Sequence, residues 1–307
     1  MHRIAAIALL VCATAQAAAP TDRYPDVAAA YWVEVDGRPL WAGHADQRLP
    51  MASLTKLMTA LVAVEQGDLD TWVEVSAGAA TETGTRLGLR RGASAFRRDL
   101  LLAALVRSAN DACRALADSI GAKADAGNAT DAQARTSSPG TTAESRTSRG
   151  TTADRRDPTA AFVARMNARA AELGLVDTHY TDPCGHDDAA QYTSARDLAA
   201  LAHAVLAEPV LAEAVQRREL RLATAAGRVL SARTTNPLLD GLPGARGLKT
   251  GTTPAAGRCL VAVVERDGRR VLVVLLHAPE RWWDSVGLVE LAFDAVPPHA
   301  APDAATR

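Results

Sequence analysis

The chain has 307 residues, of which 48% are hydrophobic, so it is long enough for one large domain or two ordinary ones with a packed core. Its formal net charge at pH 7 is −1. This balance gives no basic surface for nucleic acid or for an anionic membrane, and we expect neither as a partner.

The first residues predict an export signal. Residues 1–3 are a short basic start, residues 4–13 are apolar, and residues 15–17 (Ala-Gln-Ala) offer a small-x-small cleavage site. The apolar run is too short to span a bilayer, and no membrane anchor is apparent later in the chain. We therefore expect a signal peptide over 1–17, then an exported, soluble protein of the periplasm or another extracytoplasmic space.

The first half of the chain predicts a hairpin followed by buried helices. Residues 29–41 contain two short strands around the turn signal Asp36-Gly37. From Ser53 to residue 64 the pattern is helical and almost without a polar face, which is typical of a helix in the middle of a domain. A second apolar helical run covers residues 100–106 and stops before Ser108.

Residues 122–157 differ in composition from the rest. They contain no Leu, Ile, Val, Phe, Tyr or Trp and are rich in Thr, Ser, Ala, Gly, Arg and Asp. Such a segment cannot bury enough apolar area to offset its ordering entropy. We expect a disordered, low-complexity insertion on the surface.

The second half returns from helices to strands. Helices are predicted over 159–173, 194–206 and 282–295, and strands over 259–264 and 271–276 around the turn signal Asp267-Gly268. Because strands lie at both ends with a helical block between them, we predict an α/β fold with one antiparallel sheet built from both termini. A single domain should cover 20–296, and 297–307 should be a flexible tail.

Removal of the signal peptide leaves three cysteines, Cys113, Cys184 and Cys259. So few in a large domain do not form a disulfide framework. One bridge in an oxidising compartment, or three small buried packing residues, are both open interpretations.

Only three lysines occur, Lys56, Lys123 and Lys249, although Lys and Arg together number 34. An Arg guanidinium does not lose its proton in a protein, whereas a desolvated Lys amine can. A site that needs an amine as a base would therefore retain lysine in a chain that otherwise uses arginine.

Ser53 and Lys56 form the first of three short motifs. Spacing of three places both side chains on one helix face, and a serine at a helix start has a base one turn away and an amide donor for an oxyanion. A chance Ser-x-x-Lys match is expected about once in roughly 300 residues. A capping serine with a surface lysine is the alternative, but the run around Lys56 is too apolar for a surface.

The second and third motifs are Ser108-Ala109-Asn110 and Lys249-Thr250-Gly251-Thr252. Each alone could be an ordinary loop or a solvated strand end. In the functional interpretation Ser108 relays a proton between Lys56 and the leaving group, and Asn110 donates to the substrate amide. The third motif should precede the strand pair of 259–276.

Each of the four residues of that third motif has an expected role. Lys249 and Thr250 would hold a carboxylate, Gly251 would let substrate backbone approach a strand edge, and the Thr252 N–H would be a second oxyanion donor. The three motifs in this order match the set of penicillin-binding proteins and class A β-lactamases.

From about residue 28 to 296 the chain resembles the serine-type D-Ala-D-Ala carboxypeptidases of peptidase family S11, the low-molecular-mass penicillin-binding proteins. Similar stretches are 50–60, 108–112, 162–167, 192–197 and 247–261. The resemblance implies a penicillin-binding fold without metal or cofactor, Ser53 as acyl-ester nucleophile and Lys56 as proton acceptor. It implies peptidoglycan stem peptides as substrates and β-lactam antibiotics as acylating inhibitors.

Departures from the family leave one alternative open. Residues 183–186 (Pro-Cys-Gly-His) replace a more usual Pro-Ser-Gly-Leu, the insertion interrupts a short connection, and the usual β-rich C-terminal domain is not apparent. Some relatives hold the terminal carboxylate of the substrate with a basic residue after the last strand. Here Asp284 lies near that position, and Arg281 is only a weak substitute for the basic residue. A DD-endopeptidase of the same family therefore remains the alternative to a carboxypeptidase.

Two further alternatives are disfavoured. A class A β-lactamase needs a Glu-x-x-Leu-Asn motif, and the only Glu between residues 158 and 207, Glu172, does not begin one. A non-catalytic peptidoglycan-binding protein would not need the intact Ser53, Lys56, Asn110 and Lys249.

Overall fold

The computed structural model describes residues 21–122 and 157–296. The expected signal peptide, the insertion between residues 123 and 156 and the tail lie outside the described residues. Within them, no helix is both long and apolar enough to cross a bilayer.

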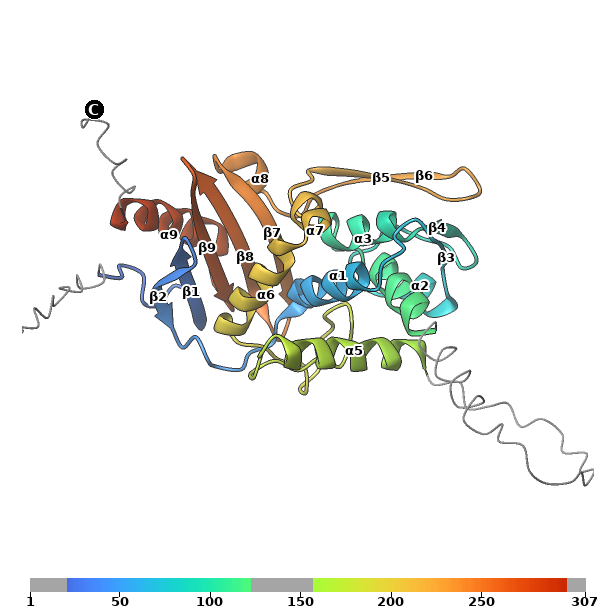
Figure 1. Cartoon of the computed structure of the whole chain (residues 1–307), viewed down its shortest axis with the longest axis horizontal. Helices are drawn as coiled ribbons and strands as arrows, with labels where there is room; N and C mark the ends of the chain where they lie inside the picture. The colour runs from blue at the N-terminus through green and yellow to red at the C-terminus, as the bar shows by residue number, and fades with distance from the viewer. Residues whose placement is uncertain (1–20, 123–156, 297–307) are drawn as a thin grey trace, which may run out of the picture.

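A five-stranded antiparallel sheet joins the two ends of the described chain, in the order β2-β1-β9-β8-β7 (Figure 1). Its strands are β1 (Ala30–Val35), β2 (Arg38–Gly43), β7 (Ala245–Thr253), β8 (Gly257–Arg266) and β9 (Arg269–Leu276). Both predicted hairpins are present, and the residues of the turns Asp36-Gly37 and Asp267-Gly268 have positive φ, as tight two-residue turns require. The predicted sheet assembled from both termini is confirmed.

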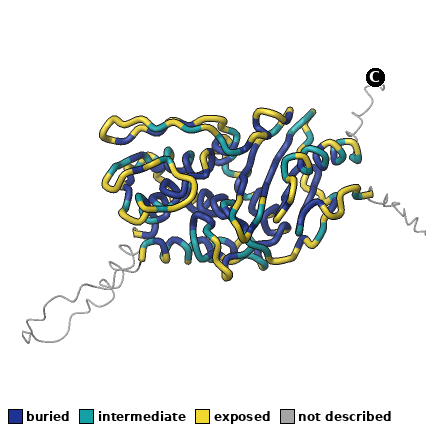
Figure 2. The backbone as a smooth tube through the Cα atoms, turned by 180° about the vertical axis from the view of Figure 1, so that it is seen from behind, coloured by how far each residue is buried: buried dark blue, intermediate teal, exposed yellow. Residues whose placement is uncertain are grey.

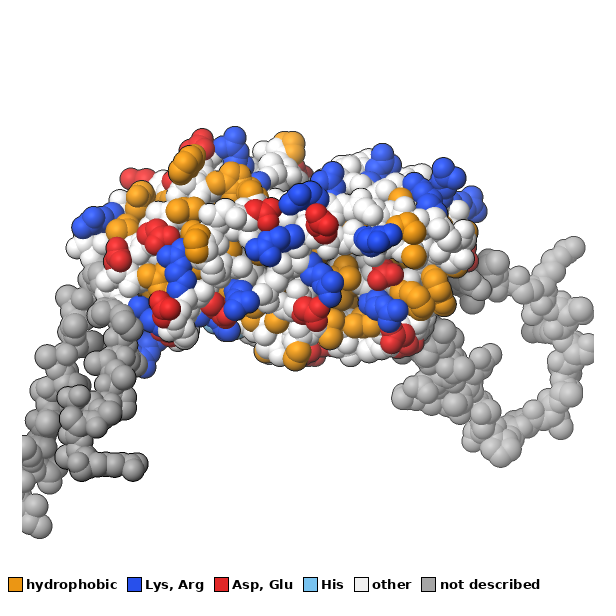
Figure 3. Space-filling view, turned by 90° about the horizontal axis from the view of Figure 1, so that it is seen from above, with side chains coloured by type: hydrophobic (Ala, Val, Ile, Leu, Met, Phe, Trp, Pro, Cys, Tyr) orange, Lys and Arg blue, Asp and Glu red, His pale blue; other side chains and the backbone are white. Residues whose placement is uncertain are grey.

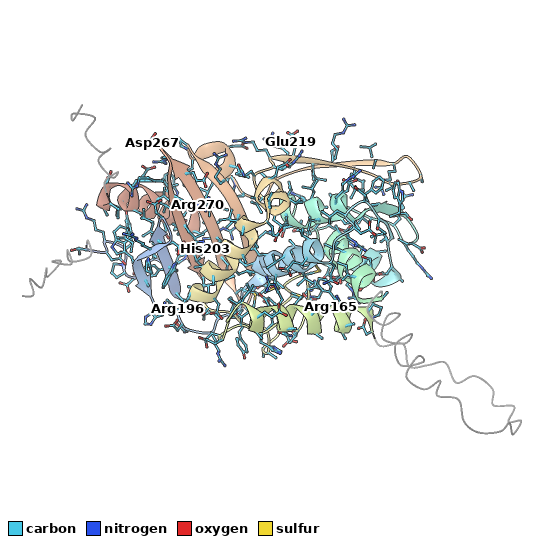
Figure 4. All side chains as sticks on the ribbon, in the orientation of Figure 1. Arg165, Arg196, His203, Glu219, Asp267 and Arg270 are labelled. Carbon is cyan, nitrogen blue, oxygen red and sulfur yellow. A yellow bond between two sulfur atoms is a disulfide. The ribbon has the colours of Figure 1, made fainter. Side chains whose placement is uncertain are left out.

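Helices cover both faces of this sheet. In β9, Leu272, Val274 and Leu276 join the core shared with the helical block, while the alternate residues face α9 (Arg281–Ala295) on the other side. Helix α6 (Ala195–Ala207) lies on the first face, where His203 Nε2 is 2.5 Å from Oε1 of the buried Glu34 (Figures 1 and 4). The sheet is thus buried on both sides, consistent with its long apolar strands (Figure 2).

Helix α1 (Lys56–Glu65) runs through the middle of the helical block, and its residues from Lys56 to Ala63 are buried. Around it lie α3 (Arg97–Val106), α5 (Pro158–Glu172), α6 and α7 (Pro209–Ala214), and residues 110–122 form a further helix. The predicted helices over 53–64, 100–106, 159–173, 194–206 and 282–295 are therefore confirmed within a few residues. Charges of both signs alternate over the face in Figure 3, in keeping with the small net charge.

Shorter elements complete the fold and were not predicted. They are β3 (Trp72–Glu74), α2 (Ala77–Thr81), β4 (Ser94–Phe96), β5 (Glu219–Ala223), β6 (Val229–Arg233) and α8 (Leu238–Gly241). The hairpin β5–β6 lies over α3, and its buried Leu220 and Leu222 alternate with exposed residues.

One expected boundary needs correction. Ser53 does not open an α-helix: it lies in a 3-10 turn, η1 (Ala52–Thr55), and α1 begins only at Lys56. The Lys249 motif precedes the strand pair β8–β9, as expected, and is itself part of a further strand, β7, at the edge of the sheet next to β8.

Candidate active site

The turn that carries Ser53 packs between β7 and the loop 182–191. A Cβ on Gly251 would lie 3.1 Å from the Ser53 nitrogen, and one on Gly185 would lie 2.1 Å from the Ala52 oxygen. Ala52 itself has φ of 48°, a conformation that costs a non-glycine residue about 1–3 kcal/mol. Two glycines and a strained turn therefore place Ser53 at the meeting point of the sheet and the helical block.

Lys56 is the buried base candidate beside this serine. Its Nζ is fully buried and donates to Ser53 Oγ at 3.0 Å, to Asn110 Oδ1 at 2.7 Å and to the Cys184 carbonyl. Burial lowers the pKa of Lys56 from 10.5 to about 7, against the opposing field of Asp182 and Glu82. The amine can thus be neutral near pH 7, as a group that takes the proton of Ser53 must be.

Lys249 approaches the site from the strand side. Its Nζ donates to Ser108 Oγ at 2.9 Å and to the Thr250 carbonyl at 2.9 Å, and the residue is 1% exposed. Burial lowers the pKa of Lys249, and the neighbouring Lys56 and Arg281 lower it further. Ser108 is therefore hydrogen-bonded to Lys249, and its role as a proton relay from Lys56 stays a prediction.

Asn110 joins the site to the loop that follows α2. Its Nδ2 donates to the Thr83 carbonyl at 2.7 Å, and its backbone N–H donates to the Thr85 carbonyl at 2.7 Å. The next residue, Asp111, accepts backbone N–H groups from three residues of the same loop. The structure thus brings all four predicted catalytic residues together, with Asn110 fixed from both ends of its side chain.

The remaining predicted residues line the neighbouring strand. Thr250 Oγ1 lies 3.0 Å from Thr235 Oγ1, and Thr252 follows Gly251 toward the end of β7. The roles we assigned to Thr250 and to the Thr252 N–H stay predictions.

Arg281 reaches β7 from the other side of the sheet edge. From the first turn of α9 its Nη1 donates to the Gly251 carbonyl at 2.6 Å, to Thr252 Oγ1 at 2.8 Å and to the Cys259 carbonyl at 3.2 Å. No spacing rule could show this, because 30 residues separate it from Gly251 and only the sheet order brings them together. Asp284, by contrast, lies one turn further along α9.

The loop 182–191 contributes residues that the sequence did not identify. Asp182 Oδ1 accepts the backbone N–H groups of Cys184, Gly185 and His186 at 2.6–3.0 Å. Burial raises the pKa of Asp182, but its hydrogen bonds with His186 and with the loop amides lower it to about 2. The His186 ring lies 3.1 Å from Asp182 and 3.2 Å from Glu82, and both carboxylates raise its pKa to about 10.

Three cationic side chains, Lys56, Lys249 and Arg281, converge on Ser53 and β7. Within the described part of the chain, none of the three forms an ion pair with a carboxylate, and their hydrogen-bond acceptors are hydroxyl, amide and carbonyl oxygens. Lys249 and Arg281 therefore place positive charge beside β7 without a carboxylate partner, which favours an anionic ligand there.

Comparison with known proteins points to one family. A family model described as D-alanyl-D-alanine carboxypeptidase matches residues 15–126 and 158–280. The carboxypeptidase DacB2 of Mycobacterium tuberculosis is 29% identical over 90% of this chain and 86% of its own length. A D-alanyl-D-alanine endopeptidase of Pseudomonas aeruginosa is 31% identical over 79% of this chain and 68% of its own.

The solved structures agree with the sequence relatives. The DD-transpeptidase of Streptomyces K15 superposes with a TM-score of 0.72 at 26% identity, over 87% of this chain and 97% of that one. Some relatives are longer, and the chain spans 61% of the length of DacF from Bacillus subtilis. The penicillin-binding fold implied by the family resemblance is thereby confirmed.

Proposed function

Because the chain belongs to the S11 family of D-alanyl-D-alanine carboxypeptidases, we propose that it is an exported serine DD-carboxypeptidase. It would remove the terminal D-alanine from peptidoglycan stem peptides and be acylated by penicillins. The observation that carries the covalent step is the 3.0 Å contact between Ser53 Oγ and the buried Lys56 amine. The pKa of that amine, about 7, suits proton transfer at neutral pH.

The proposed reaction has two steps at one serine. Neutral Lys56 takes the proton as Ser53 Oγ attacks the carbonyl carbon of the penultimate D-alanine, and the Ser53 and Thr252 N–H groups stabilise the oxyanion. The C–N bond then breaks as the leaving amine takes a proton from the Ser108 hydroxyl, which is hydrogen-bonded to Lys249 and is reprotonated by the Lys56 ammonium. In the second step Lys56 takes a proton from water as the water oxygen attacks the ester carbonyl, and it returns this proton to Ser53 Oγ when the ester C–O bond breaks.

The charge balance supports a substrate with a free terminal carboxylate. Lys249, Arg281 and the Thr250 and Thr252 hydroxyls lie along β7, on the side where the leaving D-alanine would bind. A carboxylate there would supply the missing negative charge and raise the lowered pKa of Lys249. A crosslinked peptide whose leaving group is a longer chain gains less from this arrangement. DD-endopeptidase activity is the second candidate, favoured by the relatives of that name.

Digestion of pentapeptide monomers and crosslinked dimers side by side tests the proposal. We expect release of D-alanine from monomers, with dimers cut more slowly. Arg281→Gln should lower kcat/KM for monomers about tenfold or more, because a hydrogen bond to a charged group contributes about 1.5–3 kcal/mol. Arg270→Gln, at the far end of β9, is the matched control and should change little (Figure 4). Faster cleavage of dimers would make the protein a DD-endopeptidase.

A further inference from the structure

The third partner of the Lys56 amine is a backbone carbonyl, that of Cys184, and it lies outside every helix and strand. The other two partners, Ser53 and Asn110, are placed by η1 and by the helix 110–122. The position of the Cys184 carbonyl depends instead on how the loop 182–191 is held. The hydrogen-bond geometry around the Lys56 amine therefore depends partly on this loop.

One covalent link holds the loop against the helix that carries Asn110. Cys113 and Cys184 form a disulfide with a Cα–Cα distance of 5.9 Å across 71 residues of sequence. Both residues are buried, 0% and 1% exposed, and they pack against Ala104 of α3. Cys113 lies one turn after Asn110, so the link joins the two elements that supply oxygen acceptors to Lys56.

The same loop also packs against the nucleophile. Gly185 follows Cys184 directly and lies against Ala52 and the Ser53 nitrogen, with no room for a side chain. Thr59 of α1 donates to the Pro183 carbonyl at 2.5 Å. A shift of residues 183–185 would therefore change both the surroundings of the amine and the turn that presents Ser53.

We propose that the Cys113–Cys184 disulfide is a positioning link of the active site, which fixes the Cys184 carbonyl relative to Asn110 and so orients the Lys56 amine for proton transfer from Ser53. The inference rests on the proposed function, because acylation of Ser53 is its readout.

Loss of the link has two expected consequences. Acylation should slow about five- to tenfold, since a net hydrogen-bond loss of about 1–1.4 kcal/mol corresponds to that factor. The pH dependence should shift as well. Burial is the main cause of the low Lys56 pKa, so a loosened loop that admits water raises this pKa and moves the acid limb of the acylation rate to higher pH. The defect should shrink in alkaline solution.

The experiment compares Cys113→Ala, Cys184→Ser and the double variant in the full chain. Peptide mapping without reductant should first recover Cys113 and Cys184 of the wild type in one linked pair. Stopped-flow acylation by a fluorescent penicillin, measured across pH, should then show the same defect in all three variants, because either substitution alone removes the link. If either Cys113→Ala or Cys184→Ser fails to fold, the acylation rate and pH profile of the other single variant test the proposal.

A matched control separates positioning from stability. Leu222→Ala empties a buried site under the β5–β6 hairpin, away from Ser53, and should lower Tm without changing the acylation rate or its pH profile. Unlinked cysteines in the wild type would overturn the proposal, and so would link variants that lose Tm but keep the wild-type rate and pH profile. If wild-type Ser53 were not acylated at all, the proposed function would fail instead.

Discussion

The two walls of the site each present a buried lysine, and the two lysines differ in what they touch. On the helical wall Lys56 contacts the Ser53 hydroxyl, the Asn110 side chain and a loop carbonyl. On the strand wall Lys249 contacts Ser108 and its own strand, with Arg281 nearby. Burial lowers the pKa of both amines. Burial alone therefore does not distinguish the proposed roles of Lys56 and Lys249. The contact of Lys56 with Ser53, the proposed nucleophile, does so.

The walls also differ in how their residues are brought together. Ser53 and Lys56 lie three residues apart and meet through one turn of chain. Lys249 meets Ser108 across 141 residues, and Arg281 meets Gly251 across 30, through the order of the sheet. The proposed proton-transfer pair is therefore formed by local sequence, whereas the proposed carboxylate site depends on the fold as a whole. The predictions below test this division.

Removal of the nucleophile should have the largest effect. Ser53→Ala leaves no hydroxyl to form the acyl ester, so covalent labelling by a fluorescent penicillin should vanish in intact-protein mass spectrometry. Ser231→Ala, on the exposed side of β6, should label as the wild type does. Equal labelling of the Ser53 variant would assign the nucleophile elsewhere.

The same substitution in the two lysines should separate the walls. Lys56→Arg places a permanent charge where a proton acceptor is needed, and the acylation rate should fall roughly 100-fold or more. Lys249→Arg keeps the positive charge and should leave measurable acylation. Both rates come from stopped-flow labelling, with circular dichroism to confirm folding. Equal rates in the two variants would contradict the division of roles.

The pH dependence of acylation should follow Lys56. Its pKa is lowered to about 7, and only the neutral amine accepts a proton, so the rate should rise with pH and level off above about 7. Below that pH the rate should fall about tenfold per unit. A rate already maximal at pH 5 would show that another group is the base.

Sequence reasoning reached the hairpins, the long helices and the three motifs because each depends on local patterns. The turn signals Asp36-Gly37 and Asp267-Gly268 and the apolar run after Ser53 needed no knowledge of distant residues. The short strands β3 and β4, three residues each, offer too few positions for a period to show. Strands this short are recognised only by the strand with which they pair, and their own sequence does not identify them.

The parts of the site that the sequence missed are long-range or lie in the backbone. The Cys184 carbonyl is a main-chain group, so no residue type marks it as an acceptor for Lys56. The pairing of Cys113 with Cys184 was left open because three cysteines allow several arrangements, and the structure leaves Cys259 as the buried free thiol of the described residues. The contact of Arg281 with β7 depends on α9 beginning beside that strand, which the sequence does not show.

The smallest effect is expected far from both walls, at the segment between residues 122 and 157. Its flanks already lie together: a Cβ on Gly121 would meet the Pro158 carbonyl, and Asp118 Oδ1 accepts from Thr159 Oγ1 at 2.6 Å. Replacing residues 123–156 by a short Gly/Ser link keeps Asp157, whose side chain caps α5, and closes a gap that is already narrow. Tm and the acylation rate should stay nearly unchanged, because shortening a loop alters its closure entropy only slowly. Calorimetry and penicillin labelling measure both, with Asp118→Asn as a control that weakens the junction itself. A loss of folding or of acylation on deletion, without one for Asp118→Asn, would show that the segment contributes contacts of its own.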